Sequence, residues 1–467
     1  MLQIASLAAY AVYFSVIIVL GFIAYRRNQQ TGDYILGGRK LSYWVTALAA
    51  QASDMSAWLF MVFPAGVYTM GLLGGWTAVG CVLFMMLNWV LIAPKLRTMT
   101  EFHGSATLSS FFEKRFNDTS GALRIISGIC ALMFLMFYIA GTLAALGHLF
   151  EIIFHLNYFY GICAGSLVVF YILLGGYTSV AWIDCFQGML LMCAIVAVPI
   201  AAWHALGTTA ISNALQAHGA FNFIPTSWDG LGASLMVLIG WGPGYFGQPQ
   251  IITKFMGIDN AKNITKARYV GLAWQTITLV AAACVGLVGL AYFPQALSNP
   301  EHVFIALTHD LFNPFLAGLI LCAIIAASIN AIGGQVLACA SVITEDFVKR
   351  VSHTRTALIP LISRLAVIAV CGIALITAYL NEHTTITQQI FYAWSGLGCS
   401  FGPLVLVALH TRMKSRYAAI LGVVVGALVG ICWQPIFGGS QAATLLIGFC
   451  ASMSAMFVGN LFFRKQV

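Results

Sequence analysis

A single carboxylate interrupts the apolar run ALAAQASDMSAWLFM, at Asp54. A charged side chain near the centre of a membrane helix costs about 2.5–3.5 kcal/mol on insertion scales, so one that is retained usually faces a cavity and binds something. Ser53 and Ser56 add hydroxyl oxygens, and hard oxygen ligands suit a small cation. Asp54 can also cap a half-helix, and the two roles can coexist. We predict a cation-binding role for Asp54.

Glycine and proline interrupt a second apolar run, LIGWGPGYFGQPQI. Such residues weaken a helix and free backbone groups, which a bilayer tolerates only where they line a cavity or are buried in protein. Trp241 and Tyr245 flank this break, and Trp58 and Tyr138 lie in or near the other spans of the expected cavity. Aromatic residues of membrane helices usually pack or lie in the interfacial belt, but rings beside a break can also enclose an apolar ring. We predict a pocket for such a substrate, whose charged groups contact the half-helix ends.

Two further charged residues have ambiguous roles. Asp184 lies in GGYTSVAWIDCFQGMLLM, a few residues into a span from its cytoplasmic face. It can cap that helix at its positive end or meet a basic residue of an inner gate. Arg39 precedes a span, where most basic residues simply mark the cytoplasmic side.

The high hydrophobic and low charged fractions of the chain indicate that membrane-spanning helices position these residues. The chain has 467 residues, of which 60% are hydrophobic and only 8% charged, with a mean hydropathy of +0.91. A soluble domain carries roughly 25% charged residues, so this chain cannot cover itself with a water-facing surface. We predict an all-α polytopic membrane protein with about thirteen spans, each of about 20 residues. They begin near residues 4, 41, 72, 121, 158, 180, 230, 269, 302, 357, 385, 417 and 441.

The basic residues predict the orientation. With the N-terminus outside, all 22 Lys and Arg residues fall on one side of the membrane. Positive residues mark the cytoplasmic side, so the chain is expected to be N-out and C-in. The net charge of +8 therefore reflects topology and does not indicate a nucleic-acid partner.

The two interrupted spans lie about five spans apart, which is the pattern of an inverted five-helix repeat with a binding site at the midplane. We therefore predict one transport domain over residues 1–467. It comprises an extra N-terminal helix (4–27), a first repeat (41–206), a second repeat (230–409) and two C-terminal helices (417–463).

Several long motifs resemble the sodium/solute symporter family: DYILGGRKL, TALAAQASDMSAWLFM, RIISG, GGYTSVAWIDCFQ, GWGPGYFGQPQI and VITED. The resemblance runs from about residue 10 to residue 430. It implies a leucine-transporter-like core and uptake of L-proline, coupled to a sodium gradient, across the cytoplasmic (inner) membrane. It further implies a transporter rather than an enzyme, with no cofactor besides the coupling ion and no obligate protein partner.

The resemblance also implies residue roles. Sodium would contact the backbone of Ala52 and Met55, the carbonyl of Ala327, and Asn330, with Asp54 and Ser56 beside it. The proline pocket would be lined by Trp58, Tyr138, Trp241, Tyr245 and Pro249. Arg39 and Asp184 would belong to the cytoplasmic gating apparatus.

One segment departs from the family pattern. The family supplies two adjacent hydroxyl residues to sodium, whereas AASINAIGGQ has Asn330 and Ala331 at those positions. Asn330 still offers an amide oxygen, but Ala331 offers no side-chain ligand, and ligand number sets the affinity for a hard cation. Three alternatives follow: proton-coupled or uncoupled proline transport, a related small organic solute, and, more remotely, a membrane sensor.

Overall fold

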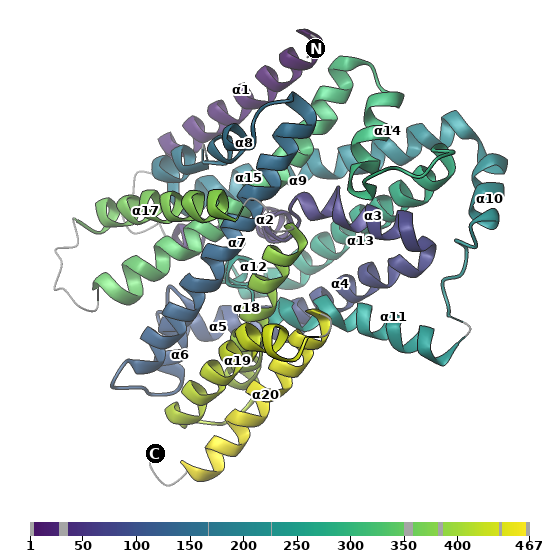
Figure 1. The fold of residues 1–467 in the computed structure, drawn as a ribbon. Coiled ribbons are helices and arrows are strands. Elements are labelled where there is room, and N and C mark those ends of the chain that lie inside the picture. Colours follow the sequence, from purple (N-terminus) through teal and green to yellow (C-terminus); the bar gives the residue numbers. More distant parts are fainter. Residues whose placement is uncertain are drawn as a thin grey trace.

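The computed structural model describes residues 4–27, 36–166, 168–225, 227–349, 358–381, 386–438 and 441–463. Within these ranges the chain is helical, and the only β-structure is one parallel bridge between Leu41 and Ile258 (Figure 1). The predicted span starts at 357 and 385 lie outside the described residues, as do Arg350, Arg355, Arg464 and Lys465 of the charge count.

The described part of the chain contains nine helices that are long and apolar enough to cross a membrane. Among the long elements are α7 (Ala122–Phe154), α9 (Val168–Leu206), α13 (Ile264–Tyr292) and α15 (Pro314–Ser341). Four more are α17 (Ile359–Leu380), α18 (Ile386–His410), α19 (Arg416–Phe437) and α20 (Gln441–Phe462), and the ninth candidate covers Ala57–Phe102. Helix α1 (Ile4–Arg27) holds a shorter apolar segment, Ile4–Leu20. The finding agrees with the predicted polytopic membrane protein, while the count of about thirteen spans and the N-out orientation stay predictions.

Shorter helices complete the bundle. They are α4 (Trp76–Leu87), α5 (Ala93–Phe102), α6 (Leu108–Arg115), α8 (Tyr158–Gly165), α10 (Thr208–Ala217) and α14 (Val303–Leu311). In Figure 1, α1 lies at the top of the ribbon, and α19 and α20, which pack against each other and against α18, lie at the bottom.

The first interrupted span consists of two separate helices, α2 (Tyr43–Asp54) and α3 (Val62–Met70). Asp54 is the last residue of α2, and Met55 takes an extended conformation. Ser56 then accepts a hydrogen bond from the Trp58 N–H at 3.3 Å and caps the short turn that leads into α3. Ser56, one of the polar residues that marked the break in the sequence, therefore satisfies a backbone N–H that the break frees.

The second interrupted span is divided in the same way into α11 (Trp228–Trp241) and α12 (Pro249–Met256). A tight turn over Gly242–Gly247 joins them, and Gln248 is extended before Pro249 starts α12. Gly244 is required by packing, because a Cβ there would lie 2.1 Å from Nε1 of Trp394 on α18.

The two breaks are held by a buried scaffold. Helix α15 is buried along nearly its whole length and contacts α1, α2, α7 and α9. Small residues allow this close packing, as expected for membrane helices. At Gly318, for example, a Cβ would stand 3.1 Å from Ala9 of α1.

One predicted boundary is wrong. The span expected to begin near residue 302 begins instead at Pro314, after the separate short helix α14. Asn313 caps α15 by accepting the Leu316 N–H at 3.0 Å, and proline is favoured at the first helical position because its missing N–H has no partner there. These local signals outweigh the apolar residues of α14, which had extended the predicted span.

Candidate functional site

A small cavity lies between the two breaks. Its walls contain four of the five residues predicted to line the substrate pocket, together with Asp54, Met55 and Ser56 of the predicted ion site. The four are Trp58, Tyr138, Trp241 and Tyr245. The first break, the second break and α7 therefore meet at one place, as the sequence predicted.

Three lining residues were not predicted: Cys81 from α4, and Ile390 and Trp394 from α18. Trp394 closes the aromatic wall. Its ring centroid lies 5.0 Å from that of Tyr245 and 5.8 Å from that of Trp241, and its Nε1 donates to the Trp241 carbonyl at 3.0 Å. Trp58 adds a further face, 5.7 Å from Trp241. Such a wall can hold a small apolar ring.

Asp54 is bonded across the cavity to the other break. The Tyr245 hydroxyl donates to Oδ2 of Asp54 at 2.8 Å. No basic side chain of the described residues pairs with this carboxylate. A carboxylate inside a membrane protein is normally balanced by a partner, so a cation-binding role for Asp54 stays a prediction.

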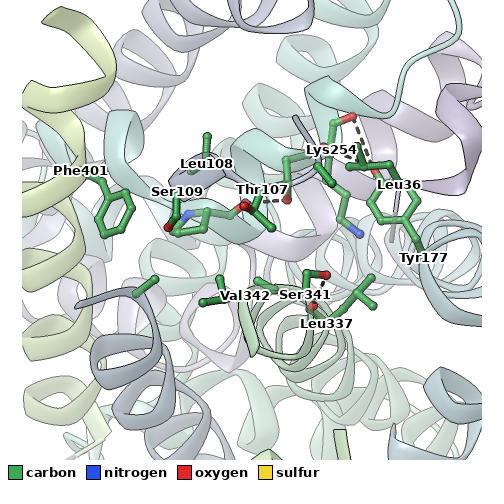
Figure 2. A pocket seen from close by; sticks show the side chains of 16 residues that line it. Leu36, Thr107, Leu108, Ser109, Tyr177, Lys254, Leu337, Ser341, Val342 and Phe401 are labelled. Carbon is green, nitrogen blue, oxygen red and sulfur yellow. Dashed lines mark hydrogen bonds between the residues drawn. The ribbon is translucent and has the colours of Figure 1, made fainter. Parts of the chain in front are cut away.

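Pro249 does not line this cavity. It lies in the wall of a second cavity, with Tyr177, Thr253 and Lys254. Figure 2 shows Lys254 and Tyr177 toward one end of the second cavity and Phe401 at the other. Pro249 therefore lies apart from the four aromatic residues in this structure, because it starts α12 beyond the extended residue Gln248, and its role in the substrate pocket stays a prediction.

The remaining residues of the predicted sodium site come from α2 and α15, which contact each other. Ala52, Ala327 and Asn330 are fully buried. The Asn330 amide nitrogen donates to the Asp184 carbonyl at 3.5 Å, while its Oδ1 has no hydrogen-bond partner among the described residues. That free oxygen fits an ion ligand, and Ala331 beside it supplies none from its side chain.

Asp184 meets a basic residue rather than capping a helix. It lies inside α9, beyond a sharp turn at Gly176, and its Oδ2 is 2.7 Å from Nζ of Lys254 on α12. Ser53 of α2 donates to the same oxygen at 3.4 Å. In the sequence, Lys254 is one of the 22 basic residues that mark the predicted cytoplasmic side.

Arg39 lies apart from both cavities. Its guanidinium donates to the Met256 carbonyl at 2.8 Å and to the Ser105 carbonyl at 3.0 Å. It therefore ties the segment before α2 to the end of α12 and to the connection between α5 and α6.

A membrane bundle in which two broken helices enclose a carboxylate and an aromatic wall has the architecture of a secondary transporter. A model of the Sodium:solute symporter family matches residues 34–426, and the chain belongs to this family.

Curated relatives extend over most of the chain. The chain is 40% identical over 439 residues to a sodium/proline symporter of Staphylococcus aureus (strain Newman), which covers 91% of this chain and 84% of the relative. It is 38% identical over 452 residues to the high-affinity proline transporter PutP of Bacillus subtilis (strain 168), covering 94% of each.

Solved structures show the fold. A Na⁺-coupled sialic acid symporter in a substrate-bound outward-open state superposes with a TM-score of 0.82 at 16% identity, covering 99% of each chain. A nucleobase-cation-symport-1 family transporter superposes with a TM-score of 0.58 at 15% identity, covering 92% of this chain and 95% of that one. These likenesses confirm the predicted all-helical, leucine-transporter-like fold, while the residue limits assigned to the two repeats stay predictions.

Proposed function

We propose that this multi-pass membrane protein takes up L-proline together with sodium by alternating access, across the cytoplasmic (inner) membrane. The observation that carries the proposal is the cavity between the two breaks. There the carboxylate of Asp54, which has no basic partner among the described residues, faces an aromatic wall. Relatives at 38–40% identity that are named as proline transporters supply the substrate. Neither a catalytic step nor a protein partner is part of the proposal.

In this mechanism the pyrrolidine ring lies among Trp58, Trp241 and Trp394. The half-helix ends beside the breaks hold the carboxylate and ammonium of the substrate, because frayed helix termini expose unpaired backbone donors and acceptors. Sodium lies close by, in contact with the backbone near Ala52 and Met55, the Ala327 carbonyl and the free Oδ1 of Asn330. Asp54, without a cationic partner, stabilises the added charge.

Coupling follows from the position of the ion. A cation at the end of α2 orders the first break and completes the pocket, so substrate binds more tightly when sodium is present. By linkage, substrate must strengthen sodium binding by the same factor. Each positive charge carried inward also gains roughly 2.3 kcal/mol per 100 mV of membrane potential, which supports accumulation.

Radiolabelled proline uptake into proteoliposomes tests the proposal. An inward sodium gradient should drive accumulation above equilibrium, and a proton gradient at the same membrane potential should not. Correctly folded protein that takes up no proline under any gradient would exclude proline as the substrate.

The Asn330–Ala331 pair favours a second candidate function, proline transport coupled to protons or to no ion. The same experiment separates the two, because accumulation would then follow the proton gradient, or equilibration would be independent of both gradients. A competition panel of small zwitterions and organic anions would reveal a related substrate.

A further inference from the structure

The Tyr245 hydroxyl, which links the second break to Asp54, has a further hydrogen-bond partner on α13. It donates to Oδ2 of Asp54 at 2.8 Å and accepts a hydrogen bond from Nε2 of Gln275 at 3.5 Å. The Cys81 thiol also interacts with this hydroxyl, but a thiol is only a weak donor. A tyrosine hydroxyl carries one proton and can also accept. With the Gln275 amide on its oxygen, the proton is directed to the carboxylate.

Gln275 lies behind the cavity wall. It is fully buried, and the described residues that line the cavity do not include it. A buried amide costs free energy unless it is hydrogen-bonded. The Tyr245 hydroxyl is the partner of its Nε2, while its Oε1 has none among the described residues. The side chain of Gln275 is therefore explained by its bond to Tyr245 and not by contact with a substrate.

Helix α13 gives Gln275 a fixed base. The preceding residue, Trp274, donates its Nε1 to the Gly188 carbonyl of α9 at 3.0 Å. One turn earlier, Gly271 packs so closely on α2 that a Cβ there would lie 3.0 Å from Nε2 of Gln51. A side chain on a continuous, well-packed helix is held more precisely than one on an irregular segment. Gln275 can thus act as a reference point for the irregular turn that carries Tyr245.

The backbone and the ring of Tyr245 are held by other residues. Asn88 is the first residue of a π-helical turn (Asn88–Ile92) between α4 and α5, and its Nδ2 donates to the Tyr245 carbonyl at 3.2 Å. The Tyr245 ring meets Trp394 edge-on, with centroids 5.0 Å apart. The task left to Gln275 is to set the direction of the hydroxyl.

We propose that Gln275 is a positioning residue for the coupling carboxylate: it orients the Tyr245 hydroxyl, and the hydroxyl holds Asp54. The negative charge is then in place at the end of α2 before sodium arrives, and a preorganised site binds more tightly because less order is lost on binding. This inference rests on the proposed sodium-coupled uptake. Gln275 acts through Tyr245 and contacts neither the ion nor the substrate.

Proline uptake by proteoliposomes at varied external sodium tests the role of Gln275. Gln275→Met keeps the length of the side chain and removes its amide. It should raise the sodium concentration for half-maximal uptake roughly tenfold, since a tenfold change corresponds to about 1.4 kcal/mol, the size of one hydrogen bond. The maximal rate at saturating sodium and proline should stay within about twofold of the parent, because bound ligands restore the same site. Thr276→Val, at the next and exposed position of α13, is the matched control and should behave as the parent.

The Tyr245→Phe background separates positioning from a general packing effect. Without the hydroxyl, Gln275 has nothing to orient, so Gln275→Met should then change the sodium dependence by less than about twofold. Asn88→Leu is the contrasting variant. Asn88 bonds to the backbone carbonyl of residue 245, which Tyr245→Phe retains, so the two effects should add. Parental sodium dependence in Gln275→Met, or its full tenfold effect in the Tyr245→Phe background, would overturn the positioning role.

Thermal unfolding of the full chain in lipid nanodiscs, without sodium or proline, repeats the comparison independently of transport. Gln275→Met should lower the unfolding midpoint more in the parent than in the Tyr245→Phe background, where the amide has already lost its partner. Equal losses in the two backgrounds would overturn the inference. A parent chain that takes up no proline under any gradient would refute the proposed function, and the unfolding comparison would still decide whether Gln275 holds Tyr245. The two failures are therefore distinguishable.

Discussion

Replacing Asp54 with asparagine should abolish sodium-coupled accumulation while leaving the fold intact. The substitution removes one charge and almost no volume. The Tyr245 hydroxyl, which donates to Asp54 at 2.8 Å, can donate equally to an amide oxygen. The contact between the two breaks is therefore retained, and the lost quantity is the negative charge that no described basic residue balances.

The magnitude follows from Coulomb's law. A sodium ion about 4 Å from the carboxylate gains about 4 kcal/mol at an effective dielectric constant of about 20. Because about 1.4 kcal/mol corresponds to a tenfold change in affinity, Asp54→Asn should weaken sodium binding by about two to three orders of magnitude. Sodium at ordinary assay concentrations would then no longer support proline binding.

Proline uptake by proteoliposomes, measured against external sodium concentration, checks this expectation. Asp310→Asn is the matched control, because Asp310 is an exposed carboxylate of α14 outside both cavities, and it should behave as the parent. Asp54→Glu keeps the charge and should keep part of the coupling. If Asp54→Asn accumulated proline with unchanged sodium dependence, the assignment of the cation to this carboxylate would be refuted.

Three further expectations can be tested on the same preparations. Trp241→Ala should raise the KM for proline by about tenfold or more, because it removes a central face of the aromatic wall, and should leave the sodium dependence nearly unchanged. Ala331→Ser should lower the sodium concentration needed for half-maximal uptake, since it restores a hydroxyl ligand; an unchanged or higher value would contradict a sodium ion at this place. Arg124→Met should lower the free energy of unfolding by about 3–5 kcal/mol, because it strands the buried Asp346 carboxylate that Arg124 contacts at 2.7 Å. Thermal unfolding measures this loss, with the exposed Lys262→Met as the control that should change little.

Most residues that line the cavity between the two breaks could be identified from the sequence, because the signals of the breaks are local. Polar residues within an apolar run, such as Asp54 and Ser56, and a Gly- and Pro-rich turn are visible in the sequence itself, so the two breaks could be located before any tertiary contact was known. Trp241 and Tyr245 lie within such a break and were found with it. Trp394, in contrast, lies in the regular helix α18, and nothing in its neighbourhood shows that its indole N–H bonds to the Trp241 carbonyl.

Lys254 was missed for a different reason. A basic residue after an interrupted span is what the positive-inside rule expects, so its charge already had an explanation. Its partner Asp184 lies on another helix, and pairing between helices carries no periodic signal along the chain. Pro249 belongs to the same motif as Trp241 and Tyr245, but it follows the extended residue Gln248 and lies in the wall of the second cavity.

The start of α2 and the end of α12 are bonded to each other, which limits how α12 can move on its own. Leu41, just before α2, forms a parallel bridge with Ile258, just after α12, and its N–H donates to the Gly257 carbonyl at 3.2 Å. Arg39 adds its bond to the Met256 carbonyl. Displacement of α12 from α9 must therefore carry the start of α2 along, or these bonds break. Ser53, near the other end of α2, bonds to the same Asp184 carboxylate as Lys254. In the proposed mechanism, an ion that orders the end of α2 would therefore act on a short helix that is bonded to α9 at one end and to the end of α12 at the other.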